Sequence, residues 1–288
     1  MSSPDNPQFE PQPSVSAEQI PVTSAPDPFA PTSITAVPTA PPTVENPVWD
    51  GWDVLSIVGL TLAVVVAVPV IEAVIAQRIW YSHDSFLDVA QKLQQMPSVL
   101  IFSQFLIYIP VAACMVALVE GKYRVRFWQA IRWNWPRAGW RILALGAVMF
   151  FFLSLLQNFL PMPKDTPFEH LFDSPRDAYL LSIIAVTLGP LMEELFFRGF
   201  MYPVLARRMG LAWGVALTAL PFGLIHLPQY GWAWGAALVI FLVGIVCGVV
   251  RAVTRSVGAS FLVHAGFNGT QMLIAMVMTQ GFRHMPKA

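Results

Sequence analysis

Residues 188–200 read LGPLMEELFFRGF, and this stretch decides the fold because it places two adjacent glutamates inside an apolar run. Glu193 and Glu194 are the only acidic residues among the 111 that follow Asp177. A charged group near the centre of a bilayer costs about 2.5 to 3.5 kcal/mol on insertion scales. The pair therefore predicts a membrane helix whose carboxylates are paired or take part in chemistry.

The rest of the chain supplies the apolar partners that such a helix needs. Of the 288 residues, 56% are hydrophobic and 12% are charged, and the mean hydropathy is +0.58, which excludes a purely water-soluble enzyme. In lipid the backbone must satisfy its own hydrogen bonds, and about 20 helical residues cross the hydrocarbon core. The sequence predicts an all-α, polytopic transmembrane helix bundle of about seven spans. The apolar runs lie near 53–77, 98–119, 141–160, 178–208, 211–227, 232–250 and 257–280.

The beginning of the chain has a different composition. Residues 1–47 hold 12 of the 25 prolines and contain neither Lys nor Arg. Such a segment has too little apolar surface to offset the entropy lost on ordering. We expect a disordered, proline-rich N-terminal tail over residues 1–48 and a transmembrane helical domain over 49–288, whose motif-bearing part spans about 178–280.

The distribution of Lys and Arg predicts the orientation in the membrane. The connection from 120 to 141 holds the densest basic cluster of the chain, and the positive-inside rule places such a cluster in the cytoplasm. With alternating spans, ten basic residues fall on the cytoplasmic side and six on the opposite side. The sequence therefore predicts an integral protein of the cell membrane with a cytoplasmic N-terminus.

Composition also excludes two other classes of site. The 17 basic and 17 acidic residues balance, and no basic patch is present to neutralise a phosphate backbone, so nucleic acid is not an expected partner. Cys114 and Cys247 lie in apolar runs without C-x-x-C spacing. Neither a disulfide framework nor a thiolate zinc site is indicated.

Helical spacing separates the two glutamates. Glu194 and Arg198 stand four apart and can form an ion pair on one helix face. Glu193 lies about 100° around the helix and faces Phe197, without a cation in its own turn. It is the acidic residue that this pairing leaves available for chemistry.

Two later spans carry polar groups that could meet Glu193. If the chain reverses at Gly210, Glu193 and His226 are each about sixteen residues from the turn and lie at one depth. His264 and Asn268 stand four apart and share a helix face. His264 is only about ten residues from its turn, an offset of about 9 Å at about 1.5 Å per residue, which tilt or uneven turns must absorb.

These residues support more than one chemistry. Glu193 and His226 could hold and deprotonate a water, while His264 and Asn268 donate to the oxyanion of an attacked carbonyl. Glu193, His226 and His264 could instead ligate zinc, since three protein ligands plus water are usual in catalytic zinc sites. The residues alone leave both open, as well as a purely structural role as hydrogen bonds between helices.

The three polar clusters resemble, in order, the motifs of the CPBP family of intramembrane proteases, also called Abi or type II CAAX prenyl endopeptidases. The family's E-E-x-x-x-R is matched by Glu193, Glu194 and Arg198, its F-x-x-x-H by Phe222 and His226, and its H-x-x-x-N by His264 and Asn268. The resemblance covers about residues 141–280.

The resemblance implies peptide-bond cleavage at a site that opens toward the cytoplasm. It assigns water activation to Glu193 and His226, oxyanion stabilisation to His264 and Asn268, and supporting roles to the other motif residues. Both zinc-dependent and metal-free mechanisms have been argued for the family, so a zinc cofactor stays open. The implied partners are the lipid bilayer and a peptide or lipid-modified protein substrate, such as a prenylated CAAX protein or a bacteriocin.

Two hypotheses from other classes compete with the endopeptidase. A non-catalytic immunity or scaffold protein would use the same polar cluster only for helix packing. A transporter could use buried Glu and His side chains as a proton relay. Peptide cleavage that is lost in Glu193→Gln would support the endopeptidase, and protection that survives substitution of Glu193 and His226 would favour the immunity or scaffold protein.

Overall fold

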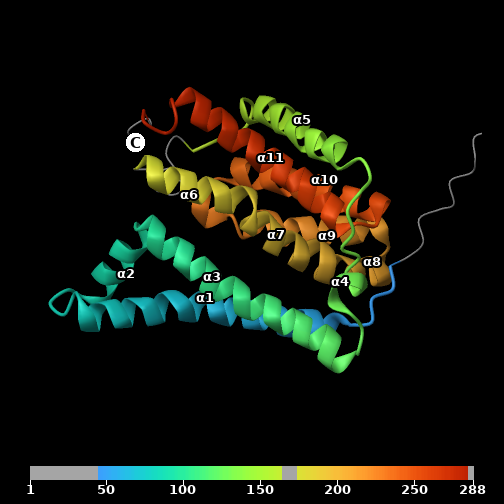
Figure 1. The fold of residues 1–288 in the computed structure, drawn as a ribbon, viewed down its shortest axis with the longest axis horizontal. Coiled ribbons are helices and arrows are strands. Elements are labelled where there is room, and N and C mark those ends of the chain that lie inside the picture. The colour runs from blue at the N-terminus through green and yellow to red at the C-terminus, as the bar shows by residue number, and fades with distance from the viewer. Residues whose placement is uncertain (1–44, 164–173, 285–288) are drawn as a thin grey trace, which may run out of the picture. The chain divides into compact units, whose positions relative to one another are not determined.

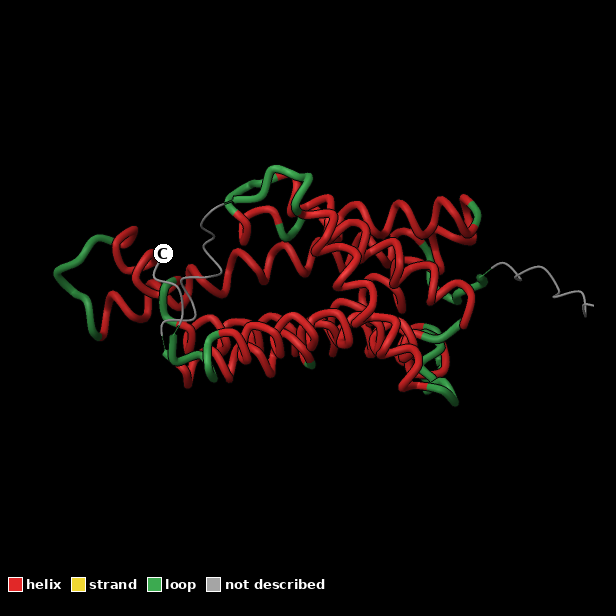
Figure 2. Tube along the Cα trace, turned by 90° about the horizontal axis from the view of Figure 1, so that it is seen from above, coloured by secondary structure: helices red, strands yellow, loops and turns green. Residues whose placement is uncertain are grey.

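The structure, a computed structural model, describes residues 45–163 and 174–284. These residues form helices and connections without a strand, which confirms the all-α prediction (Figures 1 and 2). The helices are α1 (Gly51–Ile79), α2 (Phe86–Gln94), α3 (Pro97–Val116), π-helix η1 (Ala117–Lys122), α4 (Phe127–Ala130), α5 (Gly139–Gln157), α6 (Pro175–Val186), α7 (Leu188–Glu194), π-helix η3 (Leu195–Met201), α8 (Tyr202–Met209), α9 (Leu211–Leu224), 3-10 helix η4 (Leu227–Tyr230), α10 (Trp234–Thr254) and α11 (Val257–Met278).

Six helical segments of the described chain are long and apolar enough to cross a membrane. They are α1, α3 with η1, α5, α6 through α8, α10 and α11. The seventh predicted span corresponds to α9, an apolar helix of 14 residues, which at about 1.5 Å per residue is shorter than the roughly 30 Å hydrocarbon core. The bundle of about seven spans is confirmed, with one short member.

The predicted tail lies almost entirely outside the described residues, and its boundary at residue 48 stays a prediction. The described residues before α1 pack on the helices. Glu45 is buried and forms ion pairs with Arg251 Nη1 at 2.9 Å and Arg132 Nη1 at 3.3 Å. The Trp49 ring stacks on Phe200, with ring centroids 5.0 Å apart, and its Nε1 donates to the Phe200 carbonyl at 2.8 Å.

Chain connectivity gives the bundle two ends. We call one the basic end: α1, α5, α9 and α11 begin there and α8 and α10 finish there. Contacts hold these segments together, since Lys122 Nζ lies 2.7 Å from Asp53 Oδ1 and the Val257 N–H donates to the Arg132 carbonyl at 3.1 Å. At the opposite end α3, α6 and α10 begin, α1, α5 and α11 finish, and η4 connects α9 to α10.

The closest helix pair fixes the position of α11, which carries two of the predicted site residues. α5 and α11 lie side by side in Figure 1. A Cβ added to Gly266 would clash with the Leu143 carbonyl oxygen, and one added to Gly146 would clash with the Val263 carbonyl oxygen. Only glycine permits this approach of the two backbones.

This contact predicts a position-specific loss of stability. Gly266→Ala is expected to destabilise the protein by about 1–3 kcal/mol or more, since the added methyl meets backbone rather than a side chain that can move. Gly269→Ala on the same helix is the matched control, because its Cβ would lie 3.5 Å from Val186 Cγ1, an ordinary contact. Thermal unfolding in detergent measures both, and equal midpoints would contradict the close packing.

Candidate active site

The helix that carries the two glutamates is not one continuous α-helix. α6 gives way to α7 at Thr187, whose φ and ψ are −117° and −77°, three residues before Pro190. α7 ends at Glu194, and a π-helix follows from Leu195 to Met201. The sequence interpretation used α-helical spacing throughout this stretch. A π-helix has wider hydrogen-bonded turns, and such turns are frequent at functional sites.

Glu194 and Arg198 form the predicted ion pair despite this change of helix type. Arg198 Nη1 lies 2.9 Å from Glu194 Oε1, and both side chains are fully buried. Arg198 Nη2 donates to the Gly244 carbonyl at 2.9 Å, and the guanidinium lies over the Phe222 ring at 4.5 Å. The two charges are thus compensated inside the bundle, as burial requires.

Glu194 also has two partners on α11 that the sequence interpretation missed. Ser260 Oγ donates to Glu194 Oε2 at 2.6 Å, and His264 Nδ1 lies 3.0 Å from Glu194 Oε1. Ser260 and His264 stand four apart, so the spacing rule that paired His264 with Asn268 could also have found Ser260. The supporting glutamate is therefore in direct contact with a predicted catalytic histidine.

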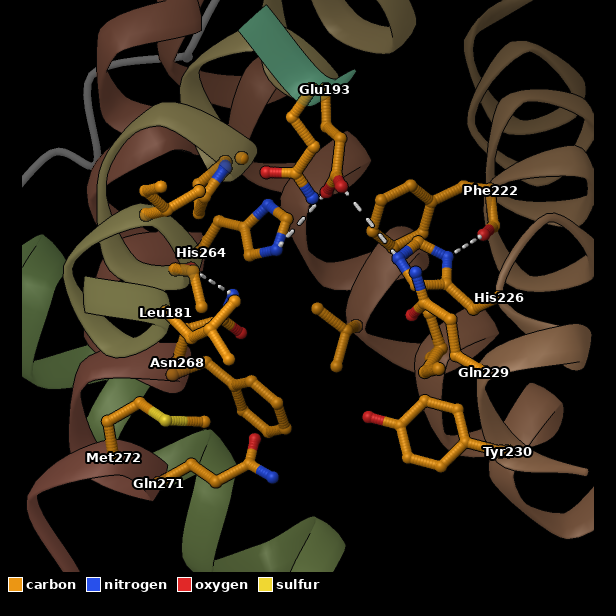
Figure 3. A pocket seen from close by; sticks show the side chains of 18 of the residues that line it. Leu181, Glu193, Phe222, His226, Gln229, Tyr230, His264, Asn268, Gln271 and Met272 are labelled. Atoms are coloured by element: carbon orange, nitrogen blue, oxygen red, sulfur yellow. Dashed lines mark hydrogen bonds and ion pairs between the residues drawn. The ribbon is translucent and has the colours of Figure 1, made fainter. Parts of the chain in front are cut away.

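Glu193 lies between the two predicted imidazoles (Figure 3). Its Oε1 is 3.8 Å from His226 Nε2, and its Oε2 is 3.6 Å from His264 Nε2. The predicted meeting of a solitary carboxylate with His226 is therefore present. His264 reaches the same carboxylate, and the expected 9 Å offset does not separate them, because depth counting assumes straight, regular α-helices and the stretch between Glu193 and Gly210 contains the π-helix over Leu195–Met201.

The Nδ1 atom of each histidine lies next to a hydrogen-bond acceptor, and this contact defines the ring tautomer. His226 Nδ1 lies 2.8 Å from the Phe222 carbonyl oxygen, and His264 Nδ1 lies 3.0 Å from a Glu194 carboxylate oxygen. These oxygens only accept hydrogen bonds, so each Nδ1 carries a proton. In the neutral ring each Nε2 then presents a lone pair toward Glu193.

Asn268 lines the same pocket, but part of its donor capacity is used. Its Nδ2 donates to the Ala185 carbonyl at 2.7 Å, near the end of α6. A carboxamide nitrogen has two N–H bonds. One N–H therefore remains for a bound group.

The pocket has a wall that sequence reasoning did not include. Gln104 and Tyr108 of α3 line it together with Gln229, Tyr230 and Gln271. Gln104 Oε1 is buried and has no hydrogen-bond partner among the described residues. Gln104 and Tyr108 stand four apart in a largely apolar span, which is the signal that could have found them.

Glu193 lies 3.8 Å from His226 Nε2 and 3.6 Å from His264 Nε2, but among the described residues these three side chains are not a group whose ligand atoms all lie within 4.8 Å of one another. Ligand atoms around a zinc ion with bonds of about 2.0–2.2 Å must lie close together. Among the described residues, Glu194, Cys247 and His264 form a group of possible metal ligands whose ligand atoms all lie within 4.8 Å of one another. Hydrogen bonds and the Arg198 ion pair already occupy both Glu194 oxygens, so this group does not fit a metal either.

These features define a polytopic membrane protein with a carboxylate held between two imidazoles in a pocket of its helix bundle. Residues 175–270 match the family model described as Rce1-like, type II CAAX prenyl endopeptidase Rce1-like. The matched segment contains every residue of the three motifs, and it confirms the resemblance to the CPBP family. Comparisons with curated proteins and with solved structures give no match.

Proposed function

We propose that the protein is an intramembrane endopeptidase that uses Glu193 as general base. The observation that carries this proposal is the position of its carboxylate, 3.8 Å from His226 Nε2 and 3.6 Å from His264 Nε2 in one pocket. Polar atoms at such separations suit a bridging water better than a direct hydrogen bond. The match to a protease family supports the same assignment.

In the proposed reaction, a water donates one O–H to Glu193 and the other to the His226 Nε2 lone pair. An oxygen lone pair is then directed at the carbonyl carbon of a peptide bond. Glu193 accepts the water proton as the C–O bond forms and passes it to the amine nitrogen as the C–N bond breaks. The products are a carboxylic acid and an amine.

The developing oxyanion needs donors, and two groups of the site can supply them. His264 donates from Nε2 when its ring carries both protons, and the Glu194 carboxylate at Nδ1 stabilises that charged form. The remaining Asn268 N–H is the second donor. Glu194 thus acts through His264, as a positioning residue.

The exposure of the site favours catalysis over a packing role. The side chains of Glu193 and His226 are 21% and 15% exposed, whereas those of Glu194 and Arg198 are fully buried. Groups that only join helices need no access to a pocket. The non-catalytic scaffold is therefore not the function that this geometry favours.

Proteomics of new protein termini tests the proposal. Membrane proteins of cells that carry the wild type are compared with those of cells that carry Glu193→Gln at equal expression. We expect a set of cleavage products that is present only with the wild type and that identifies the peptide or lipid-modified substrate. Identical sets of termini would overturn the proposed function.

The donor geometry also predicts metal-independent cleavage. We expect the purified protein to contain less zinc than one atom per chain and to keep its activity after treatment with a chelator. Elemental analysis together with activity before and after chelation checks this. Activity that is lost with the chelator and restored by added zinc would contradict it.

For localisation, we propose the cell membrane, with the basic end and the N-terminus in the cytoplasm. Among the described residues, ten basic side chains belong to the basic end or the connections beside it, and four to the opposite end. The positive-inside rule favours the cytoplasm for the first group. The division into a tail over 1–48 and a membrane domain over 49–288 remains part of the same proposal.

A further inference from the structure

The pocket has a closed side and an open side. A layer of fully buried side chains, Glu194, Arg198, Cys247 and Ser260, lies between Glu193 and the basic end. On the side of Glu193 that faces away from the basic end, the residues that line the pocket continue toward the opposite end of the bundle.

The lining residues follow the bundle toward the end opposite the basic end. Gln104 is eight positions into α3, counted from Pro97, and Leu181 is seven positions into α6, counted from Pro175. Both helices begin at that end. Gln229 and Tyr230 belong to η4, the connection between α9 and α10. Gln229 is exposed, so the pocket reaches the surface there.

The direction of the pocket conflicts with one sequence expectation. The positive-inside rule places the basic end in the cytoplasm, whereas the resemblance implies a site that opens toward the cytoplasm. The pocket extends away from the basic end, so both expectations cannot hold. The charge distribution is a property of this chain, and we follow it.

We infer that the pocket opens at the extracytoplasmic face and that the substrate is a membrane-associated polypeptide presented from that face. The existence of a substrate rests on the proposed function, whereas the direction of the opening rests on the topology of the helices alone. A prenylated C-terminus in the cytoplasm would meet the closed, basic end and would not reach Glu193.

The lining also indicates the chemistry of the bound segment. Around the mouth the side chains are neutral hydrogen-bonding groups, the carboxamides of Gln104, Gln229 and Gln271 and the hydroxyl of Tyr108. Carboxamides pair with peptide N–H and C=O groups. The buried Gln104 Oε1, which has no hydrogen-bond partner in the part of the chain that the structure describes, lines the pocket and can accept a peptide N–H. The lining therefore suits an extended, uncharged stretch of polypeptide.

Thiol labelling of the full-length protein tests the direction of the opening. The exposed Cys114 is replaced by Ala, and the fully buried Cys247 is kept. A single cysteine is then introduced by Gln229→Cys at the pocket mouth or by the matched control Gln129→Cys, an exposed position of α4 beside the basic end. Both changes replace an exposed glutamine and leave the charge distribution unchanged.

Bacterial spheroplasts that express each variant are treated with a membrane-impermeant sulfonated maleimide before and after permeabilisation. We expect Gln229→Cys to be labelled fully in intact spheroplasts and Gln129→Cys only after permeabilisation, because the reagent cannot cross the membrane and reaches only thiols on the outer face; at either face it reacts with the thiolate in water. The reverse pattern, or equal labelling of both variants in intact spheroplasts, would overturn the inference.

The new-terminus comparison provides the substrate side of the test. Cleavage sites that depend on Glu193 should map to extracytoplasmic segments beside membrane spans or lipid anchors, and sites in cytoplasmic C-termini would overturn the inference while the proposed function stands. If no site depends on Glu193, the proposed function fails. The labelling experiment still decides the direction of the opening in that case.

Discussion

Glu193→Gln is expected to lower the cleavage rate by about 10²- to 10⁴-fold, the contribution typical of a general base. Glutamine keeps the size and shape of the side chain but cannot accept the proton that the attacking water loses. The effect should fall on kcat more than on KM, since the lost interaction belongs to the transition state. Initial rates on the substrate that proteomics identifies, reconstituted in liposomes, measure it.

A second intramembrane glutamate provides the control for this substitution. Glu72 of α1 accepts a hydrogen bond from Ser103 Oγ at 2.7 Å and does not line the pocket. Glu72→Gln keeps a side-chain oxygen for this bond, so we expect wild-type activity. Full activity in Glu193→Gln, or an equal loss in both variants, would remove Glu193 from the reaction.

Glu193→Gln should also keep the stability of the wild type. The Glu193 carboxylate is partly exposed to the pocket and has no Arg or Lys partner among the described residues. Its substitution therefore leaves no buried cation uncompensated. A lowered unfolding midpoint would mean that the activity loss came from the fold.

The parts of this molecule that follow from local spacing could be predicted from sequence. The apolar runs gave the spans, and the i, i+4 rule gave the pair of Glu194 with Arg198. The isolation of Glu193 among apolar residues pointed to a functional carboxylate. In each case the physical cause acts within one helix, where the sequence determines which residues share a face.

Contacts between helices could not be predicted in the same way. They depend on how each helix is rotated and tilted, which is why the bond from His264 to Glu194 was missed although the spacing of His264 and Asn268 was recognised. The π-helix over Leu195–Met201 has no spacing signature that the α-helical rule detects. Counting residues from turns likewise overestimated the separation of His264 from Glu193, because it assumed straight helices.

Arg198→Ala is expected to destabilise the protein by about 3–5 kcal/mol, the usual result when one partner of a buried ion pair is removed. The substitution leaves the Glu194 charge without its cation and the Gly244 carbonyl without its donor. It also removes the group that packs on the Phe222 ring. Thermal or denaturant unfolding in detergent measures the loss, and stability equal to that of the wild type would contradict the ion-pair assignment.

A double variant separates the structural role of this pair from its role in catalysis. Glu194→Met combined with Arg198→Met replaces both charges with apolar side chains of similar length, and such replacements are often neutral or stabilising for a buried pair. We therefore expect the double variant to be more stable than either single variant. Its activity should stay low, because His264 Nδ1 has then lost the carboxylate that stabilises the charged ring. If activity recovered together with stability, Glu194 would serve only the fold, and the donor role of His264 would need another source of charge.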